Sequence, residues 1–301
     1  MGKKLKVLLA LTFGLAVLYP TSGQAAEPGY VTILLGRTQA GLCDASVDTM
    51  PVETVLSELS KRGYLTTGAV VLSRTDETQD TCVSELRYPS WQTLAAWHRT
   101  YGFEAVSAGN YQDMTTLSRE EQEAESCGSL PTFEQHGFTR AWGMFAYPGN
   151  RLTTEIQSEV VSTCFAYGRV YGTRINQRAE TVEPWFVHAL SVNGGACNDS
   201  AGACSGESST GTRYTSPEEV ASIMRVGADQ WGIVQFYRLV TGKRLSDGPT
   251  WDCTSDDWHQ HWTSKIETYC WNDVLTALDR IPAGTIVTDP ATVAQAWGRN
   301  P

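Results

Sequence analysis

Short apolar runs alternate with longer amphipathic stretches along most of the chain. The run YVTILLG (30–36) is typical of a buried strand, and the stretch after it places Val52, Val55 and Leu59 on one helical face. The same patterns predict further strands at 66–73, 103–109, 141–147, 165–172, 184–192, 231–240 and 284–290. They predict helices at 50–64, 88–102, 117–127, 151–164, 216–230, 261–281 and 291–298. Such alternation implies parallel strands joined by right-handed crossovers, so we expect an α/β fold, a closed barrel ahead of a doubly wound sheet.

Two of the expected helices begin with a capping signal. Ser118 is followed by Glu121, and Ser216 by Glu219, which is the spacing of a capping box. One segment, 193–212, breaks the alternation because it is rich in Gly and Ser and has no apolar period. We interpret it as an exposed loop inserted into the fold.

The first 25 residues have the pattern of a secretory signal peptide. Three lysines precede an apolar stretch of 12 residues, which is short for a membrane span, and small residues precede the expected cleavage after Ala25. We therefore expect residues 26–301 to form a single domain in a secreted or periplasmic protein. No later segment approaches 18 apolar residues, so no membrane association is expected after cleavage.

The charge of the chain changes the list of plausible partners. The formal net charge is −10, and it becomes more negative once the lysines of the leader are removed. An acidic surface argues against DNA, RNA or an anionic membrane as the partner.

The cysteine pattern indicates disulfides rather than a metal site. The chain has eight cysteines, an even number, and no two of them are spaced as C-x-x-C. Pairing in chain order closes the shortest loops and is the arrangement we expect. These pairs are Cys43–Cys82, Cys127–Cys164, Cys197–Cys204 and Cys253–Cys270.

Three stretches resemble the polysaccharide deacetylase family, the NodB-homology fold of carbohydrate esterases. They are LSELSKRGYLTTGAVVLS (56–73), WQTLAAWHRTYGFEAVSAGNYQDMTTLS (91–118) and MFAYPGN (144–150). The last is similar to the strand end in Tyr-Pro-Gly that forms one wall of the family's sugar groove. The resemblance covers about 30–237. It implies a disulfide-stapled, irregular (β/α) barrel with its groove at the C-terminal strand ends.

The resemblance also implies a zinc site whose ligands this chain lacks. Family members hold the metal with one aspartate and two histidines, beside an aspartate base and a histidine late in the barrel. Here Gly36 and Arg37 stand at the paired aspartates, Ala108 and Gln112 at the histidine pair, and Tyr237 at the late histidine. Glycine and alanine carry no donor atom, and Arg37 would repel a cation. We therefore expect no metal cofactor.

Other residues offer weaker candidates for catalysis. The pair in WHQHW, His259 and His261, is the one histidine cluster and is more simply a loop. Asp44 and Asp48 follow the first strand and could act as acid and base without a metal, although solvated loop acids explain them as well. His188 lies in an expected strand and could point into the barrel.

Aromatic and polar residues at the strand ends are the candidates for ligand contact. Sugars stack their C–H faces on aromatic rings, and phenol groups supply orienting hydrogen bonds. The candidates are Tyr147, Trp185, Tyr237, Asn110 and Arg37.

These observations leave three hypotheses for function, and whether the protein is an enzyme stays open. The first is an exported, deacetylase-like protein that binds an extracellular or cell-wall polysaccharide without deacetylating it. The second is a divergent carbohydrate deacetylase or hydrolase with a displaced, metal-independent site. The third is a secreted scaffold that binds a protein partner through the 193–212 loop.

Overall fold

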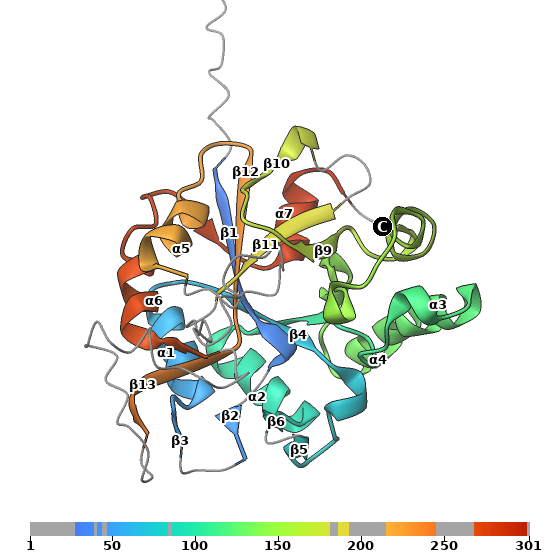
Figure 1. The fold of residues 1–301 in the computed structure, drawn as a ribbon, viewed down its shortest axis with the longest axis horizontal. Coiled ribbons are helices and arrows are strands. Elements are labelled where there is room, and N and C mark those ends of the chain that lie inside the picture. The colour runs from blue at the N-terminus through green and yellow to red at the C-terminus, as the bar shows by residue number, and fades with distance from the viewer. Residues whose placement is uncertain are drawn as a thin grey trace, which may run out of the picture.

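The centre of the protein is a closed barrel of seven parallel strands (Figure 1). The computed structural model describes residues 28–38, 41–43, 47–83, 86–180, 186–192, 215–244 and 268–299. The barrel strands, in spatial order, are β1 (Tyr30–Leu35), β4 (Thr66–Val70), β7 (Glu104–Ser107), β8 (Phe145–Ala146), β9 (Gly168–Tyr171), β11 (Phe186–Ser191) and β12 (Gln230–Phe236). Parallel pairing of β12 with β1, with Tyr30 opposite Trp231, closes the barrel. The expected (β/α) barrel is confirmed over the doubly wound alternative.

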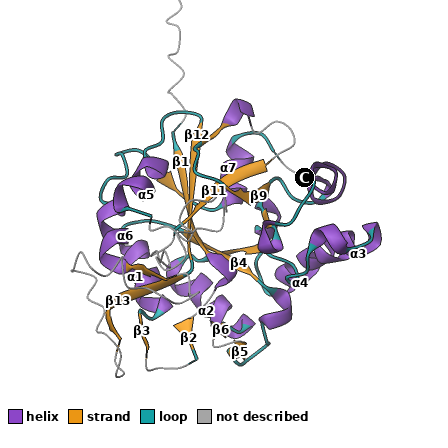
Figure 2. Cartoon of the chain, in the orientation of Figure 1, coloured by secondary structure: helices purple, strands orange, loops and turns teal. Residues whose placement is uncertain are grey.

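Helices surround the barrel on its outer face (Figure 2). They are α1 (Val52–Lys61), α2 (Trp91–Tyr101), α3 (Arg119–Glu125), α4 (Leu130–Gln135), α5 (Pro217–Met224), α6 (Trp271–Leu278) and α7 (Pro290–Ala296). Both capping boxes are present, Ser118 with Glu121 on α3 and Ser216 with Glu219 on α5. These caps satisfy backbone N–H groups that the first helical turn leaves without partners.

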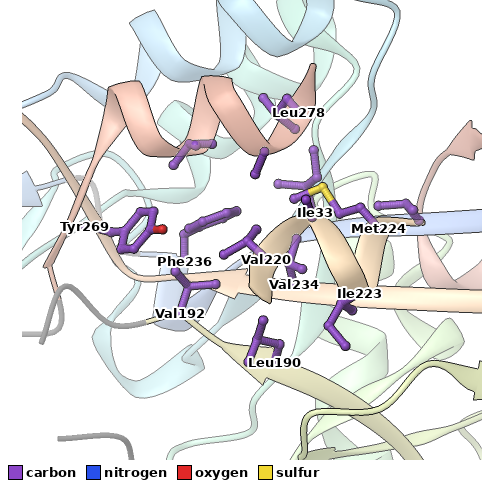
Figure 3. Packing of buried hydrophobic residues seen from close by; sticks show 14 of the residues in the cluster. Ile33, Leu190, Val192, Val220, Ile223, Met224, Val234, Phe236, Tyr269 and Leu278 are labelled. Atoms are coloured by element: carbon purple, nitrogen blue, oxygen red, sulfur yellow. The ribbon is translucent and has the colours of Figure 1, made fainter. Parts of the chain in front are cut away.

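The largest outer core lies between the barrel and helices α5 and α6 (Figure 3). Val220 and Met224 of α5 and Leu278 of α6 pack against Val234 and Phe236 of β12. The hydrophobic free energy of this layer holds the helices on the strands.

The interior of the barrel has its own core. Leu34, Val106, Ala146 and Ala189 belong to one buried cluster, which also includes Trp297, the residue just after α7. Because side chains alternate along a strand, the residues on either side of each of these face outward.

An aromatic plug closes the N-terminal end of the barrel. We use this name for Tyr30, Tyr167, Trp231 and Trp297. Trp297 meets the other three rings edge to face, with centroids 6.5, 6.4 and 5.9 Å away for Tyr30, Tyr167 and Trp231. The Trp231 indole donates a hydrogen bond of 3.0 Å to Thr32 Oγ1. Edge-to-face contact adds to the stabilisation from burial.

Two small sheets and two short strands extend the barrel. The two small sheets have three strands each, in the orders β2-β6-β5 and β14-β13-β3. Of the two short strands, β10 pairs with β12 and β15 pairs with β1. Their bounds are β2 (Gly41–Leu42), β3 (Val47–Thr49), β5 (Thr81–Val83), β6 (Leu86–Tyr88), β10 (Asn176–Gln177), β13 (Arg238–Arg244), β14 (Thr268–Cys270) and β15 (Ile286–Val287).

Three expected elements differ in the structure. The strand expected at 141–147 is reduced to Phe145–Ala146 and follows a 3-10 turn, Ala141–Gly143. The helix expected at 151–164 contains a π turn, Ile156–Val160, followed by a 3-10 turn. Of the helix expected at 261–281, the described part is helical from Trp271, because β14 pairs with β13 just before it.

Two of the expected disulfides are confirmed, Cys43–Cys82 and Cys127–Cys164. Cys270 is also disulfide-bonded, while Cys197, Cys204 and Cys253 lie outside the described residues. Disulfides of this kind are typical of proteins in an oxidising compartment. Within the described ranges, no helix has the length and apolar character needed to cross a membrane.

Candidate functional site

Unusual backbone conformations gather at the C-terminal ends of the barrel strands. Five non-glycine residues in the described chain have positive φ, and four of them follow β1, β7 or β8. These four are Arg37 (52°), Thr38 (45°), Tyr111 (70°) and Asn150 (59°). Such conformations cost free energy and concentrate at functional sites. The C-terminal end of the barrel is therefore the candidate site, which is also where sites form in other (β/α) barrels.

The end of β1 is shaped by Tyr237, the residue that follows β12. A Cβ atom placed on Gly36 would lie 2.6 Å from Cε1 of Tyr237 and 2.8 Å from Nε2 of Gln235. The ring of Tyr237 thus occupies the space that a side chain at position 36 would need. Next in the chain, Arg37 places its guanidinium carbon 5.3 Å from the centroid of the same ring.

A buried carboxylate holds the segment after β7 in its strained conformation. Glu125 is 2% exposed, and its Oε1 accepts a hydrogen bond of 3.0 Å from the backbone N–H of Gln112. Its other oxygen accepts one of 3.1 Å from Nδ2 of Asn110. Gly109, with φ of 56°, leaves room for this carboxylate, since a Cβ there would lie 2.4 Å from Glu125 Oε1. The segment presents Tyr111 at the strand ends.

Arginine and tyrosine side chains form a connected group across these strand ends. We call it the Arg/Tyr cluster, and it consists of Arg37, Arg74, Arg169, Tyr88, Tyr111, Tyr171 and Tyr237.

Tyr111 is central to the cluster. Its ring is contacted by the guanidinium of Arg37 at 5.3 Å and by that of Arg74 at 5.0 Å, both measured to the centroid. Arg74 also lies over the ring of Tyr88 at 5.0 Å and donates a hydrogen bond to its hydroxyl. Each contact of this type is worth about 0.5–2 kcal/mol.

The other half of the cluster comes from β9 and β12. The hydroxyls of Tyr171 and Tyr237 are hydrogen-bonded to each other. Arg169 places its guanidinium carbon 4.4 Å from the centroid of the Tyr171 ring. Asn150 links this side to β8, because its Oδ1 accepts a hydrogen bond of 2.9 Å from the backbone N–H of Tyr171.

The residues at this end do not suit zinc. The positions at which the resemblance implies ligands carry Gly36, Arg37, Ala108 and Gln112, and the Gln112 side chain is exposed. Throughout the described ranges, no three His, Cys, Asp or Glu side chains lie together as a metal-binding group would require. A cluster of guanidinium groups favours an anion instead.

Two of the predicted contact residues meet, and two others do not face a ligand as expected. Arg37 and Tyr237 pack together in the Arg/Tyr cluster. Tyr147 is 1% exposed and packs against Phe145, with its hydroxyl bonded to Gln157, so its ring is not available for stacking. Burial also raises the pKa of the Tyr147 phenol. Asn110 is exposed, but its side-chain amide donates a hydrogen bond to the buried Glu125.

Of the three predicted catalytic candidates, only His188 has a side chain that the structure describes. His188 faces away from the barrel interior, because its neighbours Val187 and Ala189 both belong to the interior cluster. Desolvation lowers the pKa of this histidine, helped by the charge of Arg174. The structure describes Asp48 as a backbone position of β3, while Asp44 lies outside the described residues.

Trp185, His259, His261 and the 193–212 loop also lie outside the described residues. The contact, metal and protein-partner hypotheses attached to them therefore stay predictions.

Sequence reasoning missed Arg74, Arg169, Tyr88, Tyr111 and Tyr171. One signal was present in YGRVYG (167–172), where a single arginine interrupts an apolar strand between two tyrosines. A charged residue inside a buried strand is rare unless it has a partner. The contacts of Tyr111 depend on the conformation of its loop, which no local pattern encodes.

No family model matches the chain, and no curated protein matches it. Among solved structures, it resembles the Xyl-CE4 domain of a multidomain xylanase from the hindgut metagenome of Trinervitermes trinervoides, at 13% identity and a TM-score of 0.45, covering 91% of this chain and 93% of that one. The chitin deacetylase of the fungal pathogen Colletotrichum lindemuthianum is 12% identical to this chain and has a TM-score of 0.42. The match covers 91% of this chain and 90% of that one. A family 4 carbohydrate esterase from Streptomyces lividans, in complex with acetate, is 12% identical and has a TM-score of 0.36. That match covers 71% of this chain and 80% of the esterase.

Carbohydrate esterases and deacetylases are thus among the structures that this chain resembles.

Proposed function

We propose that this protein is an exported glycan-binding protein that holds an extracellular or cell-wall polysaccharide at the C-terminal end of its barrel without deacetylating it. The observation that carries the proposal is the Arg/Tyr cluster. It joins the segments after β1, β4, β7 and β12 to β9, so its side chains lie on one end of the barrel.

The chemistry of the cluster suits a sugar. Tyr111 and Tyr171 are half-buried, so part of each residue remains accessible to solvent. A ring held in place by guanidinium groups loses little conformational entropy when a sugar contacts it, and the neighbouring N–H groups can donate to sugar hydroxyls. Glu125 adds to this preorganisation by holding the Tyr111 segment.

Loss of deacetylation follows from the residues at the expected metal site. Gly36 and Ala108 have no donor atom, and Tyr237 occupies the space beside Gly36. A Lewis acid polarises the acetamide carbonyl and is worth several kcal/mol of transition-state stabilisation, and positions 36 and 108 offer it no ligand. Stacking and hydrogen bonding in the ground state do not depend on it.

Export is part of the proposal. The N-terminal leader pattern motivates it, and the disulfides of the described chain are compatible with it because they persist in oxidising compartments.

A glycan-binding screen beside an acetate-release assay tests the function. The panel should contain chitin, peptidoglycan, and acetylated and de-acetylated plant and microbial polysaccharides. We expect binding to at least one polysaccharide and no release of acetate. Tyr111→Ala should weaken that binding by about 1–3 kcal/mol, because it removes a central ring.

Tyr101→Ala is the matched control. Tyr101 is a half-buried tyrosine on the outer helix α2, remote in the fold from the barrel mouth. Its replacement should leave affinity unchanged. Acetate release at enzymatic rates in the presence of chelator would overturn the non-enzymatic function, and absence of binding to every glycan would overturn glycan recognition.

A further inference from the structure

Arg169 is a buried cation inside the barrel. It lies on β9 between Ala146 of β8 and Val187 of β11 in the strand register. Its side chain lies on the same face of β9 as those of Tyr167, a member of the interior cluster, and Tyr171. Arg169 is only 4% exposed.

Two of the three guanidinium nitrogens of Arg169 lack a hydrogen-bond partner. Nε and Nη1 are both buried and without an acceptor among the described residues. The register neighbours Ala146 and Val187 offer only apolar side chains. Over the same ranges no carboxylate forms an ion pair with Arg169, whose recorded contact is the face of the Tyr171 ring.

Burying the Arg169 guanidinium with open N–H donors is unfavourable unless a hydrogen-bond acceptor pairs with them. A guanidinium stays protonated in proteins, so Arg169 cannot relieve its burial by losing a proton. A buried charge with open N–H donors is strongly disfavoured, and an apolar side chain of similar size would serve the barrel core better. The ring of Tyr171 compensates only part of this cost.

The residues around Arg169 indicate which chemical group would accept its open hydrogen bonds. The chain carries a net charge of −10, yet Arg37 and Arg74 stand at the same end of the barrel, where the Arg/Tyr cluster gathers them. Guanidinium groups fixed on aromatic rings keep their in-plane N–H donors available, and these match the planar geometry of a carboxylate.

We propose that Arg169 is the specificity residue for a carboxylate group on the bound glycan, so that the ligand is an acidic polysaccharide built from uronic acids. This inference rests on the proposed function, because it assigns a substrate class to the same end of the barrel. The carboxylate accepts hydrogen bonds from the open N–H groups of Arg169, and the sugar ring lies against Tyr171 or Tyr111.

The test compares acidic oligosaccharides with uncharged partners of the same backbone. Oligogalacturonate and oligoglucuronate are titrated into the full protein by calorimetry, each beside its methyl-esterified form, at constant ionic strength. We expect the acid of at least one pair to bind about 10-fold to 100-fold more tightly than its ester, as a charge-assisted hydrogen bond implies. A sulfated oligosaccharide serves as a third arm.

Variants at position 169 separate recognition from a structural role. Arg169→Met should bring the acid-to-ester ratio to about 1–2, because the charged donor that favours the acid is lost. Without ligand, Arg169→Met should unfold at the same temperature as the wild type or higher. Arg99→Gln, which removes an exposed charge on α2, should leave both the ratio and the unfolding temperature unchanged.

Each contrary outcome has a distinct meaning. Equal binding of acid and ester by the wild type would overturn the inference and leave the proposed function standing, whereas no binding of either, together with a negative glycan screen, would overturn the proposed function itself. If Arg169→Met is less stable than the wild type but keeps the wild-type acid-to-ester ratio, Arg169 has a structural role and does not recognise the ligand. Tighter binding of the sulfated arm would overturn the assignment to carboxylates. If Arg169→Met fails to fold, the wild-type ratio and Arg169→Lys, with its altered donor geometry, still decide the question.

Discussion

The two ends of the barrel are built from similar rings in opposite ways. At the N-terminal end, the aromatic plug packs ring against ring, and the indole of Trp231 donates to Thr32. At the C-terminal end, the rings of Tyr111 and Tyr237 contact guanidinium groups, and the backbone of Tyr111 adopts positive φ.

The difference separates stability from function within one fold. The plug buries its four rings against one another, as expected of a region whose role is to close the barrel. The Arg/Tyr cluster keeps charge, strain and partly exposed rings, which lower stability and are retained where a ligand is bound. The division parallels that of other (β/α) barrels, whose N-terminal face serves stability and whose C-terminal face serves chemistry.

The largest expected effect is in the plug. Trp231→Ala should lower the free energy of unfolding by about 3–5 kcal/mol, because it opens a cavity between fully buried rings and removes the bond to Thr32. Urea unfolding measures this loss. Tyr111→Ala, at the other end, should cost only about 1 kcal/mol. An equal or larger loss for Tyr111→Ala would contradict the division between the ends.

The second effect tests how tightly the C-terminal end is filled. Gly36→Ala should cost about 1–3 kcal/mol, because its methyl group would meet the Tyr237 ring. In a Tyr237→Ala background, the same change should cost much less, giving a coupling free energy of about 1 kcal/mol or more in a double-mutant cycle. Additive losses would mean that Tyr237 does not fill the space beside Gly36.

A third prediction concerns a carboxyl near the plug. Desolvation raises the pKa of Glu104 to about 7 from its ordinary 4.5, with His98 and Arg140 opposing the shift and Asp289 adding to it. Between these pH values the unfolded chain releases a proton that the folded chain keeps, so the stability falls as pH rises through this window.

Glu104→Gln should remove this loss. Between pH 5 and pH 8, the variant should gain about 2–3 kcal/mol of stability relative to the wild type, as followed by urea unfolding at each pH. Glu120→Gln, an exposed position on α3, is the control and should follow the wild type at every pH. A constant difference between Glu104→Gln and the wild type would disprove the raised pKa.

The smallest effect is expected from removal of metal ions, which should change neither stability nor binding. Extended treatment with chelator should leave the unfolding temperature and glycan binding unchanged, because Gly36 and Ala108 offer a metal no donor. Stoichiometric zinc that survives dialysis, found by elemental analysis, would contradict this and direct attention to His259 and His261.

The barrel was predictable because its strands are strongly patterned. Runs such as 30–36 and 231–240 are apolar on both faces, as parallel strands covered by helices must be. That same property hides which face is the interior. The sequence could not show that His188 faces outward or that Tyr147 is buried, since their neighbours are apolar on either side.

The candidate site was predictable only in part for a related reason. Arg37 and Tyr237 could be placed at strand ends, and the register of β1 with β12 brings them together. The position of Tyr111 depends instead on the buried carboxylate of Glu125, a contact between side chain and backbone that reaches across α3. Contacts of this type have no periodic signature in the chain.

Closure of the barrel has a consequence for how the protein folds. Tyr30, in the first strand, pairs with Trp231, in the last of the barrel strands, so one edge of β1 stays open until most of the chain is available. The disulfides Cys43–Cys82 and Cys127–Cys164 span only 39 and 37 residues and can form within separate parts of the growing chain. Long-range pairing is slow because loop-closure entropy must be overcome first. The order of the elements therefore allows both crosslinks to close before the last barrel strand can pair with β1, and an unpaired strand edge is a site of misassembly.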